Sequence, residues 1–373
     1  MKTKKVTIGS SEIDVALHRG ANYGRSPLFW ASLGEYPVYD VNAYRMMTTD
    51  RVRTSKYFNA VNKFVSGKVV LDIGTGADLN WTLASVEAGA KKVYAIEEIL
   101  ESYEKASAKI IDLGLEDKIS LIYGKSLEVN LPEKVDVCVS EIIGTIGSSE
   151  GVCVALADAR KRFMKPDAVM IPERCATKIA AVMLPDELYS SSGFDDRPFP
   201  LVGLIPMKSV EDVMNSIGYP FDCRLCISDF PQTNILSTSG VIEDLFFDKE
   251  IKSEYNFETS LEITKPGRLD GFLLWINLWV DLEGGVIDSY NQQTSWAPVY
   301  FPAFGDGVSV IAGDEIEINC EMAPSSNGVN PDYKLRGKIK TTGRDIEWKF
   351  DSFHQERRFR EGHLYKKLFP LHT

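Results

Sequence analysis

The chain has 373 residues, of which 44% are hydrophobic and 25% charged, with 53 acidic and 42 basic side chains and a formal net charge of −11. It is long enough to bury two cores as a soluble protein, and its acidic balance argues against a nucleic-acid partner. The most apolar window, residues 271–280, is too short to cross a bilayer, and the N-terminus lacks the apolar core of a secretory signal. We therefore expect a cytoplasmic protein that has no membrane anchor.

Predicted helices and strands alternate through the first half of the chain. Residues 36–64 are predicted to be helical and to cover a ligand from outside a sheet. The strand candidates that follow are 69–73, 93–96, 119–123, 135–139 and 168–171. Strands that alternate with helices predict an α/β fold with a doubly wound, mostly parallel, Rossmann-like sheet.

The pattern changes after Pro172, where short strand-like segments are separated by Pro, Gly, Asn or Ser. These segments include 176–184, 221–227, 261–264, 271–282 and 315–322. They predict an antiparallel β-barrel or sandwich. The expected domains are an N-terminal extension at 1–34, a ligand-binding α/β domain with capping N-terminal helices at 35–172, and a β-barrel domain at 173–373. A segment at 185–219 interrupts the barrel pattern with helix-like and Pro-rich pieces.

A glycine turn follows the first strand of the predicted parallel sheet. Asp72 lies among apolar residues, and Gly74 and Gly76 allow the backbone to turn tightly over a ligand. The third glycine of the dinucleotide fingerprint is replaced by Leu79, so a nucleoside with a charged amino-acid tail fits better than a pyrophosphate. Glu97 ends the next strand, where an acidic side chain can accept both ribose hydroxyls.

A second acidic feature follows the strand at 135–139. Glu141 and Glu150 lie nine positions apart, with no other charged residue between them. If the loop doubles back, both carboxylates can face one pocket, and such a pair persists where a cation compensates it. A planar guanidinium matches that geometry best. The alternative is that each glutamate is an ordinary solvated loop acid.

Histidines and cysteines offer little for a metal centre. All four histidines lie near the chain ends, with none between residues 19 and 353, and the only close cysteine pair is Cys223 and Cys226. No second pair accompanies it, so we expect no metal, reduced thiols, and chemistry that rests on carboxylates and hydroxyls.

By motif order, residues 35–340 resemble class I S-adenosylmethionine-dependent methyltransferases, and among them the protein arginine methyltransferases. The motifs are 47–53, 70–76, 96–97, the loop that carries Glu141 and Glu150, and 294–298. The resemblance implies that S-adenosyl-L-methionine is the cofactor. The residues implied to bind it are Arg53 at the methionine carboxylate, Asp72, Gly74, Thr75 and Gly76 in the turn, Glu97 at the ribose, and Ser126 and Leu127 along the adenine.

The resemblance also implies the substrate pocket and the assembly. Glu141 and Glu150 would be the catalytic residues, and the pocket would include Tyr39, Met47, Ser295 and Trp296. Ser295 stands where most family members have His; its context looks more like the symmetric-dimethylating branch, whose N-terminal barrel is absent here. The segment 185–219 would be an arm that docks on a second subunit and gives a homodimer.

The expected function is therefore N-methylation of the guanidino nitrogen of arginine, in an arginine-containing peptide or protein. One alternative is a methyltransferase for free L-arginine or another small guanidine. A second alternative is a catalytically silent binding module that keeps the cofactor fold.

Overall fold

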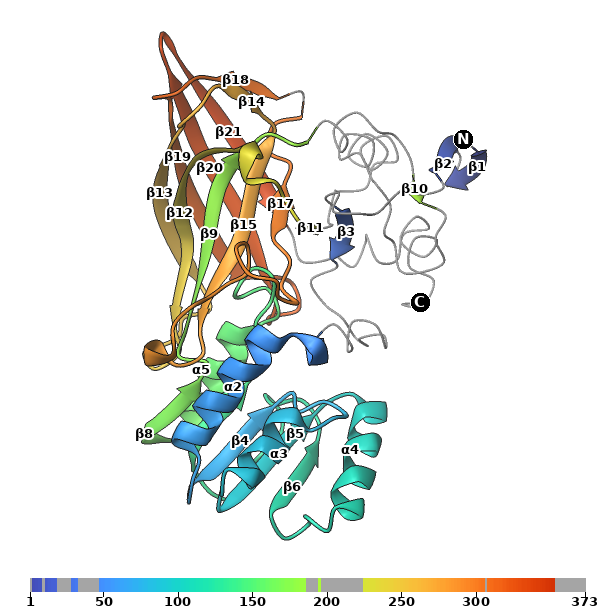
Figure 1. The fold of residues 1–373 in the computed structure, drawn as a ribbon, viewed down its shortest axis with the longest axis vertical. Coiled ribbons are helices and arrows are strands. Elements are labelled where there is room, and N and C mark those ends of the chain that lie inside the picture. The colour runs from blue at the N-terminus through green and yellow to red at the C-terminus, as the bar shows by residue number, and fades with distance from the viewer. Residues whose placement is uncertain are drawn as a thin grey trace.

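A computed structural model describes residues 2–8, 11–18, 28–32, 47–185, 194–195, 224–305 and 307–352. Figure 1 shows two regions, an α/β region and a region of long antiparallel strands, with helices α2 and α5 on the side of the α/β region that faces those strands. Their bounds are α2 Arg51–Phe64 and α5 Val152–Arg162.

The α/β region contains a five-stranded parallel sheet in the order β6-β5-β4-β7-β8. The strands are β4 Val69–Ile73, β5 Lys92–Glu97, β6 Ile119–Tyr123, β7 Val135–Ser140 and β8 Met164–Ile171. All five residues of β4 are buried, as expected for a central strand that is covered on both faces. The predicted doubly wound parallel sheet is confirmed, and β8 begins four residues before the predicted strand at 168–171.

Two more helices accompany this sheet, α3 Asn80–Glu87 and α4 Leu100–Asp112. Leu79 precedes α3 in the left-handed region, with φ of 57°. This is the position where the dinucleotide fingerprint has a glycine, which adopts that conformation without steric cost. Of the helix predicted at 36–64, the described part begins at Arg51 after a helical turn at 47–49, and residues 36–46 lie outside the described residues.

The order of the parallel strands locates a binding crevice. Strand β4 lies between β5 and β7: the chain runs from β4 outward to β5 and β6 on one side, and then returns to β7 and β8 on the other. In open α/β sheets, ligands bind at such a switch point, outside the carboxyl ends of the strands. The glycine turn follows β4 and Glu141 follows β7, so both features lie at this crevice.

The second region is built from antiparallel sheets, as predicted. A seven-stranded sheet has the path β12-β9-β15-β17-β11-β3 with β16 on β15, a four-stranded sheet has the order β13-β19-β20-β21, and β14 pairs with β18. Strand β12 adjoins the end of β13 through a bridge between Ser237 and Ile263, the residue that follows β13. The bounds are β3 Leu28–Ser32, β9 Arg174–Val182, β11 Arg224–Ser228, β12 Ile235–Phe246, β13 Tyr255–Glu262, β14 Gly267–Leu269, β15 Gly271–Trp279, β16 Ile287–Asp288, β17 Val299–Phe301, β18 Val308–Val310, β19 Glu315–Pro324, β20 Pro331–Thr341 and β21 Arg344–Ser352.

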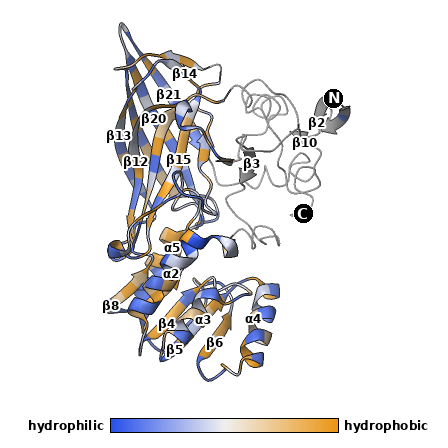
Figure 2. Cartoon of the chain, in the orientation of Figure 1, coloured by the Kyte–Doolittle hydropathy of each residue, from blue (hydrophilic) through white to orange (hydrophobic). Residues whose placement is uncertain are grey.

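Hydrophobic packing joins the two regions. Hydrophobic colouring follows the strands of the parallel sheet, and it alternates with hydrophilic colouring along the antiparallel strands (Figure 2). Among the described residues, one continuous cluster of buried side chains contains both Leu71 of β4 and Leu335 of β20, rather than two separate cores. A smaller cluster surrounds Leu273 and Tyr300. Ile143 and Ile146 belong to the large cluster, so the segment that carries the paired glutamates is part of the packed interior.

Three strands and two short 3₁₀ helices, η1 Gln232–Asn234 and η2 Leu282–Gly284, complete the described chain. Strands β1 Lys2–Ile8 and β2 Ser11–His18 form an antiparallel hairpin, and β10 Phe194–Asp195 pairs with β2. Apart from Pro185 and β10, the candidate arm at 185–219 lies outside the described residues. Within the described ranges, no helix has the length and hydrophobicity that a membrane crossing requires.

Candidate active site

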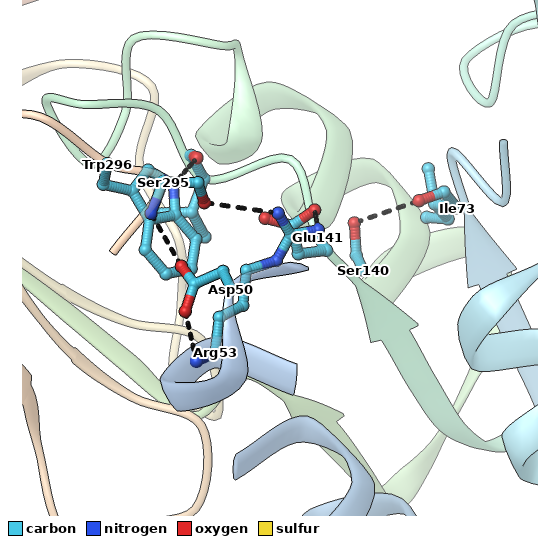
Figure 3. Close-up of polar contacts among 8 residues, drawn as sticks. Asp50, Arg53, Ile73, Ser140, Glu141, Ser295 and Trp296 are labelled. Carbon is cyan, nitrogen blue, oxygen red and sulfur yellow. Dashed lines mark hydrogen bonds and ion pairs between the residues drawn. The ribbon is translucent and has the colours of Figure 1, made fainter. Parts of the chain in front are cut away.

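Strand register brings the glycine turn and the first glutamate together. Asp72 pairs with Val139 and Ile73 with Ser140, so Glu141 leaves the sheet beside Gly74. The hydroxyl of Ser140 donates to the carbonyl of Ile73 at 3.4 Å, which ties the two strand ends together (Figure 3). The loop 141–150, named here the acidic loop, therefore begins at the crevice.

Asp72 is a fully buried carboxylate under the turn. Its Oδ2 accepts a 2.7 Å hydrogen bond from the Thr82 hydroxyl, which lies 3.0 Å from the Thr75 hydroxyl. Its Oδ1 has no hydrogen-bond partner. Burial raises the pKa of Asp72 to about 6, although the bonds from Thr82 and Thr75 act to lower it. An unpartnered oxygen of this kind suits a ligand that brings a donor.

Glu97 holds the turn from the neighbouring strand. Gly76 N donates to Oε2 and Ile99 N donates to Oε1, both at 2.8 Å. Burial raises the pKa of Glu97, and the backbone bonds oppose that rise. Each carboxylate oxygen has a second lone pair, so Glu97 can keep these bonds and still accept from a ribose hydroxyl. Gly74 and Gly76 have φ of 74° and 67°, values that favour glycine.

Ser126, Leu127 and Met47 are also expected near the cofactor or substrate. Ser126 and Leu127 follow β6 and are half-buried, and the carbonyl of Ser126 accepts from Arg162 at 2.6 Å. Met47 is half-buried in the turn before α2, where its carbonyl accepts from Asp50 N at 3.3 Å. Tyr39 lies outside the described residues.

A guanidinium of the chain itself occupies the start of the acidic loop. Arg53 of α2 is buried, and its Nη2 forms an ion pair with Glu141 Oε2 (Figure 3). Its Nη1 donates to the Ser295 hydroxyl at 3.4 Å, and its Cζ lies 5.5 Å from the centre of the Trp296 ring. Burial raises the pKa of Glu141 to about 7, although Arg53 acts to lower it. The structure thus brings three predicted site residues, Glu141, Ser295 and Trp296, together around the guanidinium of a fourth, Arg53.

Asp50 is a site residue that the sequence interpretation missed. Its Oδ1 accepts from Arg53 N at 2.9 Å and so caps α2, and its Oδ2 accepts from Ser295 N at 2.7 Å (Figure 3). An aspartate directly before a helix is a recognised capping signal, so the bond from Arg53 N could be predicted from the sequence. The bond from Ser295 N joins residues 245 positions apart, and no local sequence pattern indicates it.

Trp296 connects the antiparallel region to the acidic loop. It is buried, and its indole Nε1 donates to the carbonyl of Ile143 at 2.7 Å. Trp296 therefore both walls the space around Arg53 and holds the loop that carries Glu141. Because Ser295 is bound to Asp50 and Trp296 to Ile143, the segment between β16 and β17 is fixed on both sides of the site.

The acidic loop doubles back at Gly144. A Cβ at this position would lie 1.9 Å from Ser149 Oγ and 3.2 Å from Glu150 Cγ, so only glycine allows the two arms of the loop to approach so closely. Glu150 is half-buried at the end of the loop, just before α5. The loop therefore doubles back and brings the stem of Glu150 close to Gly144 in its first half.

No protein-family model matches the chain, but curated relatives do. Protein arginine N-methyltransferase PRMT10 of Arabidopsis thaliana is 39% identical over 139 residues, which cover 36% of this chain and 36% of the relative. Protein arginine N-methyltransferase 1 of Schizosaccharomyces pombe is 29% identical over 296 residues, which cover 75% of this chain and 82% of the relative. The match to the Arabidopsis protein thus spans little more than a third of that relative's length.

Solved structures of such proteins share the fold. Arabidopsis thaliana protein arginine methyltransferase 10, in an open conformation, superposes with a TM-score of 0.68 at 23% identity, covering 85% of this chain and 98% of the other. A Trypanosoma brucei PRMT1 enzyme–prozyme heterotetrameric complex with AdoHcy gives a TM-score of 0.67 at 19% identity, covering 84% and 98%. The chain is therefore similar in sequence to protein arginine N-methyltransferases and shares the fold of their solved structures.

Proposed function

We propose that this protein is an S-adenosylmethionine-dependent methyltransferase that acts on the guanidino nitrogen of arginine in protein substrates. The observation that carries the proposal is the guanidinium of Arg53, bound by Glu141 and next to the Trp296 ring at the carboxyl end of β7. Glu141 and Trp296 thus already bind one guanidinium through the carboxylate and aromatic contacts that a substrate arginine would use.

The residues at the crevice fit the cofactor that this function needs. Asp72 offers a buried oxygen without a partner, and Glu97 offers free lone pairs at the edge of the turn. When bound, the cofactor supplies a methyl group on a positively charged sulfonium. The residues proposed to hold it are Arg53, Asp72, Gly74, Thr75, Gly76, Glu97, Ser126 and Leu127.

The carboxylates of the acidic loop would bind and orient the substrate. An arginine side chain and a sulfonium repel each other in a dry pocket, and Glu141 and Glu150 offset that repulsion. Carboxylates bound to two of the guanidinium nitrogens draw the positive charge toward them, which leaves the remaining nitrogen more nucleophilic. Alignment of that nitrogen can contribute up to about ten kcal/mol. A glutamate can then take the proton that the nitrogen releases.

Arg53 and a substrate arginine can share the site. The ion pair of Arg53 uses Oε2 of Glu141, and Oε1 can accept from a second guanidinium. The proposed role of Arg53 at the cofactor carboxylate would move its positive charge away from Glu141. Cofactor binding would then favour entry of the substrate arginine.

The assembly and location are further parts of the proposal. A homodimer is supported by the family resemblance, and the related Trypanosoma protein is described as a heterotetrameric complex. A cytoplasmic location is proposed from the sequence alone. Neither is needed for the chemistry of the acidic loop.

The test offers cofactor labelled in its methyl group to an arginine peptide and, separately, to free L-arginine, with mass spectrometry of the products. We expect label on the guanidino nitrogen of the peptide. Label on free arginine alone would mean that the protein methylates small guanidines, and the proposal of a protein substrate would be wrong. If the protein binds AdoHcy but labels no guanidine, the remaining explanation is a catalytically silent binding module.

A further inference from the structure

A buried carboxylate of the antiparallel region, that of Glu243, anchors the acidic loop. Glu243 of β12 is only 2% exposed. Its Oε1 accepts from Ser148 N at 3.1 Å and from the Thr177 hydroxyl at 2.8 Å, and its Oε2 accepts from the Ser148 hydroxyl. Ser148 lies two positions before Glu150, so a strand of the other region holds the second half of the loop.

The direction of these hydrogen bonds requires an acceptor at position 243. Gly147 N donates to the Thr177 hydroxyl at 3.0 Å, so the single hydrogen of Thr177 is available for Glu243. The hydroxyl of Tyr333 lies 2.6 Å from that of Ser148 and can donate to it while Ser148 donates to Glu243. In this arrangement the amide and hydroxyl of Ser148 and the hydroxyl of Thr177 each present a donor, and an ionised carboxylate accepts from all three.

Close packing brings the loop to this carboxylate. Thr177 and Glu243 are cross-strand partners in the pairing of β9 with β12. A Cβ at Gly147 would lie 2.8 Å from both Glu243 Oε1 and Cys175 Sγ, so a larger residue would push the loop away. Asn330 adds a third attachment, with its Nδ2 donating to the carbonyl of Ser149 at 3.0 Å.

We infer that Glu243 is a positioning residue that fixes Glu150 relative to Glu141 in the proposed arginine site. The inference rests on the proposed function, and Glu243 would act through the backbone of Gly147 and Ser148 rather than touch the substrate. Burying a carboxylate costs stability that an apolar side chain of the same volume would not lose. An orienting role explains a charge at this place, because catalytic groups need supporting contacts that hold them in one geometry.

The test compares Glu243→Ala and Glu243→Gln with a matched control, Asp270→Asn. Asp270 is also buried in the antiparallel region, but it accepts from Leu184 N and Arg268 rather than from the acidic loop. Each variant is measured for thermal stability, AdoHcy affinity, kcat and KM on an arginine peptide, and hydrogen exchange of the amides at 144–151.

We expect Glu243→Ala to speed exchange at 144–151 and to lower kcat at least about tenfold, with AdoHcy affinity within about twofold of wild type. Glu243→Gln should keep more activity, because the Ser148 and Tyr333 hydroxyls can reverse and accept the amide hydrogen. Asp270→Asn should lose stability while keeping kcat and the slow exchange of the loop.

The inference fails if folded Glu243→Ala keeps the slow exchange or wild-type kcat, or if Asp270→Asn lowers kcat as much. If the Glu243 variants do not fold, Ser148→Ala and Thr177→Val are measured instead, because each removes one hydroxyl that binds Glu243. Hydrogen exchange at 144–151 and kcat then decide. Should wild-type protein methylate no arginine, the proposed function is refuted, and hydrogen exchange alone still decides whether Glu243 holds the loop.

Discussion

Replacing Asp72 by Asn should change the pH dependence of stability in a defined direction. Burial raises the pKa of Asp72 from its usual 3.8 to about 6, so the folded protein holds this proton more tightly than the unfolded chain. The ionised form is the disfavoured one, and its cost appears as the pH rises through that window. At about 1.4 kcal/mol per pKa unit, the difference amounts to about 3 kcal/mol once both states are ionised.

The measurement is urea unfolding of ligand-free wild type and Asp72→Asn at several pH values. Between about pH 3 and about pH 8, the free energy of unfolding of wild type should fall by about 3 kcal/mol relative to the variant. Asn cannot ionise, so any pH-independent cost of its amide hydrogens cancels from this comparison. The variant should also bind AdoHcy more weakly, because it places a donor where we propose that the cofactor needs an acceptor.

Asp136 provides a control of opposite sign on the same sheet. Burial acts to raise its pKa, but the bonds from Lys165 and Val69 N outweigh burial and lower it. Wild type should therefore gain stability relative to Asp136→Asn as the pH rises to about 4, keep that gain at higher pH, and lose it as the pH falls below about 4. Parallel pH curves for wild type and Asp72→Asn would refute the reasoning about the buried carboxyl.

Three further predictions concern the cofactor, the pH profile and the assembly. Glu97→Ala should weaken AdoHcy binding by about 1.5–3 kcal/mol in calorimetry, and unchanged affinity in a folded variant would exclude the ribose role. Because Glu141 with its pKa of about 7 must be ionised to bind a guanidinium, kcat/KM for an arginine peptide should fall as the pH drops below that value; a flat profile down to about pH 5.5 would contradict this. Deleting residues 190–200 should give a less active monomer, whereas a wild-type monomer at micromolar concentration in sedimentation would overturn the dimer.

Local patterns in the sequence were enough to predict the parallel sheet and the two features at its edge. Asp72, Gly74 and Gly76 lie within five positions of one another, and their chemistry follows from a buried strand and a tight turn. The acidic loop is also local, since nine positions separate Glu141 from Glu150. The register of the parallel strands then places the glycine turn beside the acidic loop, so their proximity follows from the predicted sheet.

The contacts that complete the site were not predictable in this way. Ser295 meets Asp50 across 245 positions, and Glu243 meets Ser148 across 95. Each partner alone is an ordinary polar residue, and only the packing of the antiparallel region on the α/β region pairs them. The long strands β20 and β21 were also not singled out, although the Asn327-Gly328 turn before β20 and the Gly343 turn between the two strands are strand-boundary signals.

The paired glutamates are proposed to bind and polarise a substrate guanidinium. The most direct measurement is the single-turnover rate of methyl transfer to an arginine peptide by Glu141→Gln, Glu150→Gln and the double variant, each loaded with cofactor. Each single change keeps the shape but removes a charge, and each should lower the rate at least about a hundredfold, which is about 2.7 kcal/mol. AdoHcy affinity should change far less, and the double variant should be little slower than the slower single one. If either single variant retains more than about a tenth of the wild-type rate, the glutamates are not the guanidinium site.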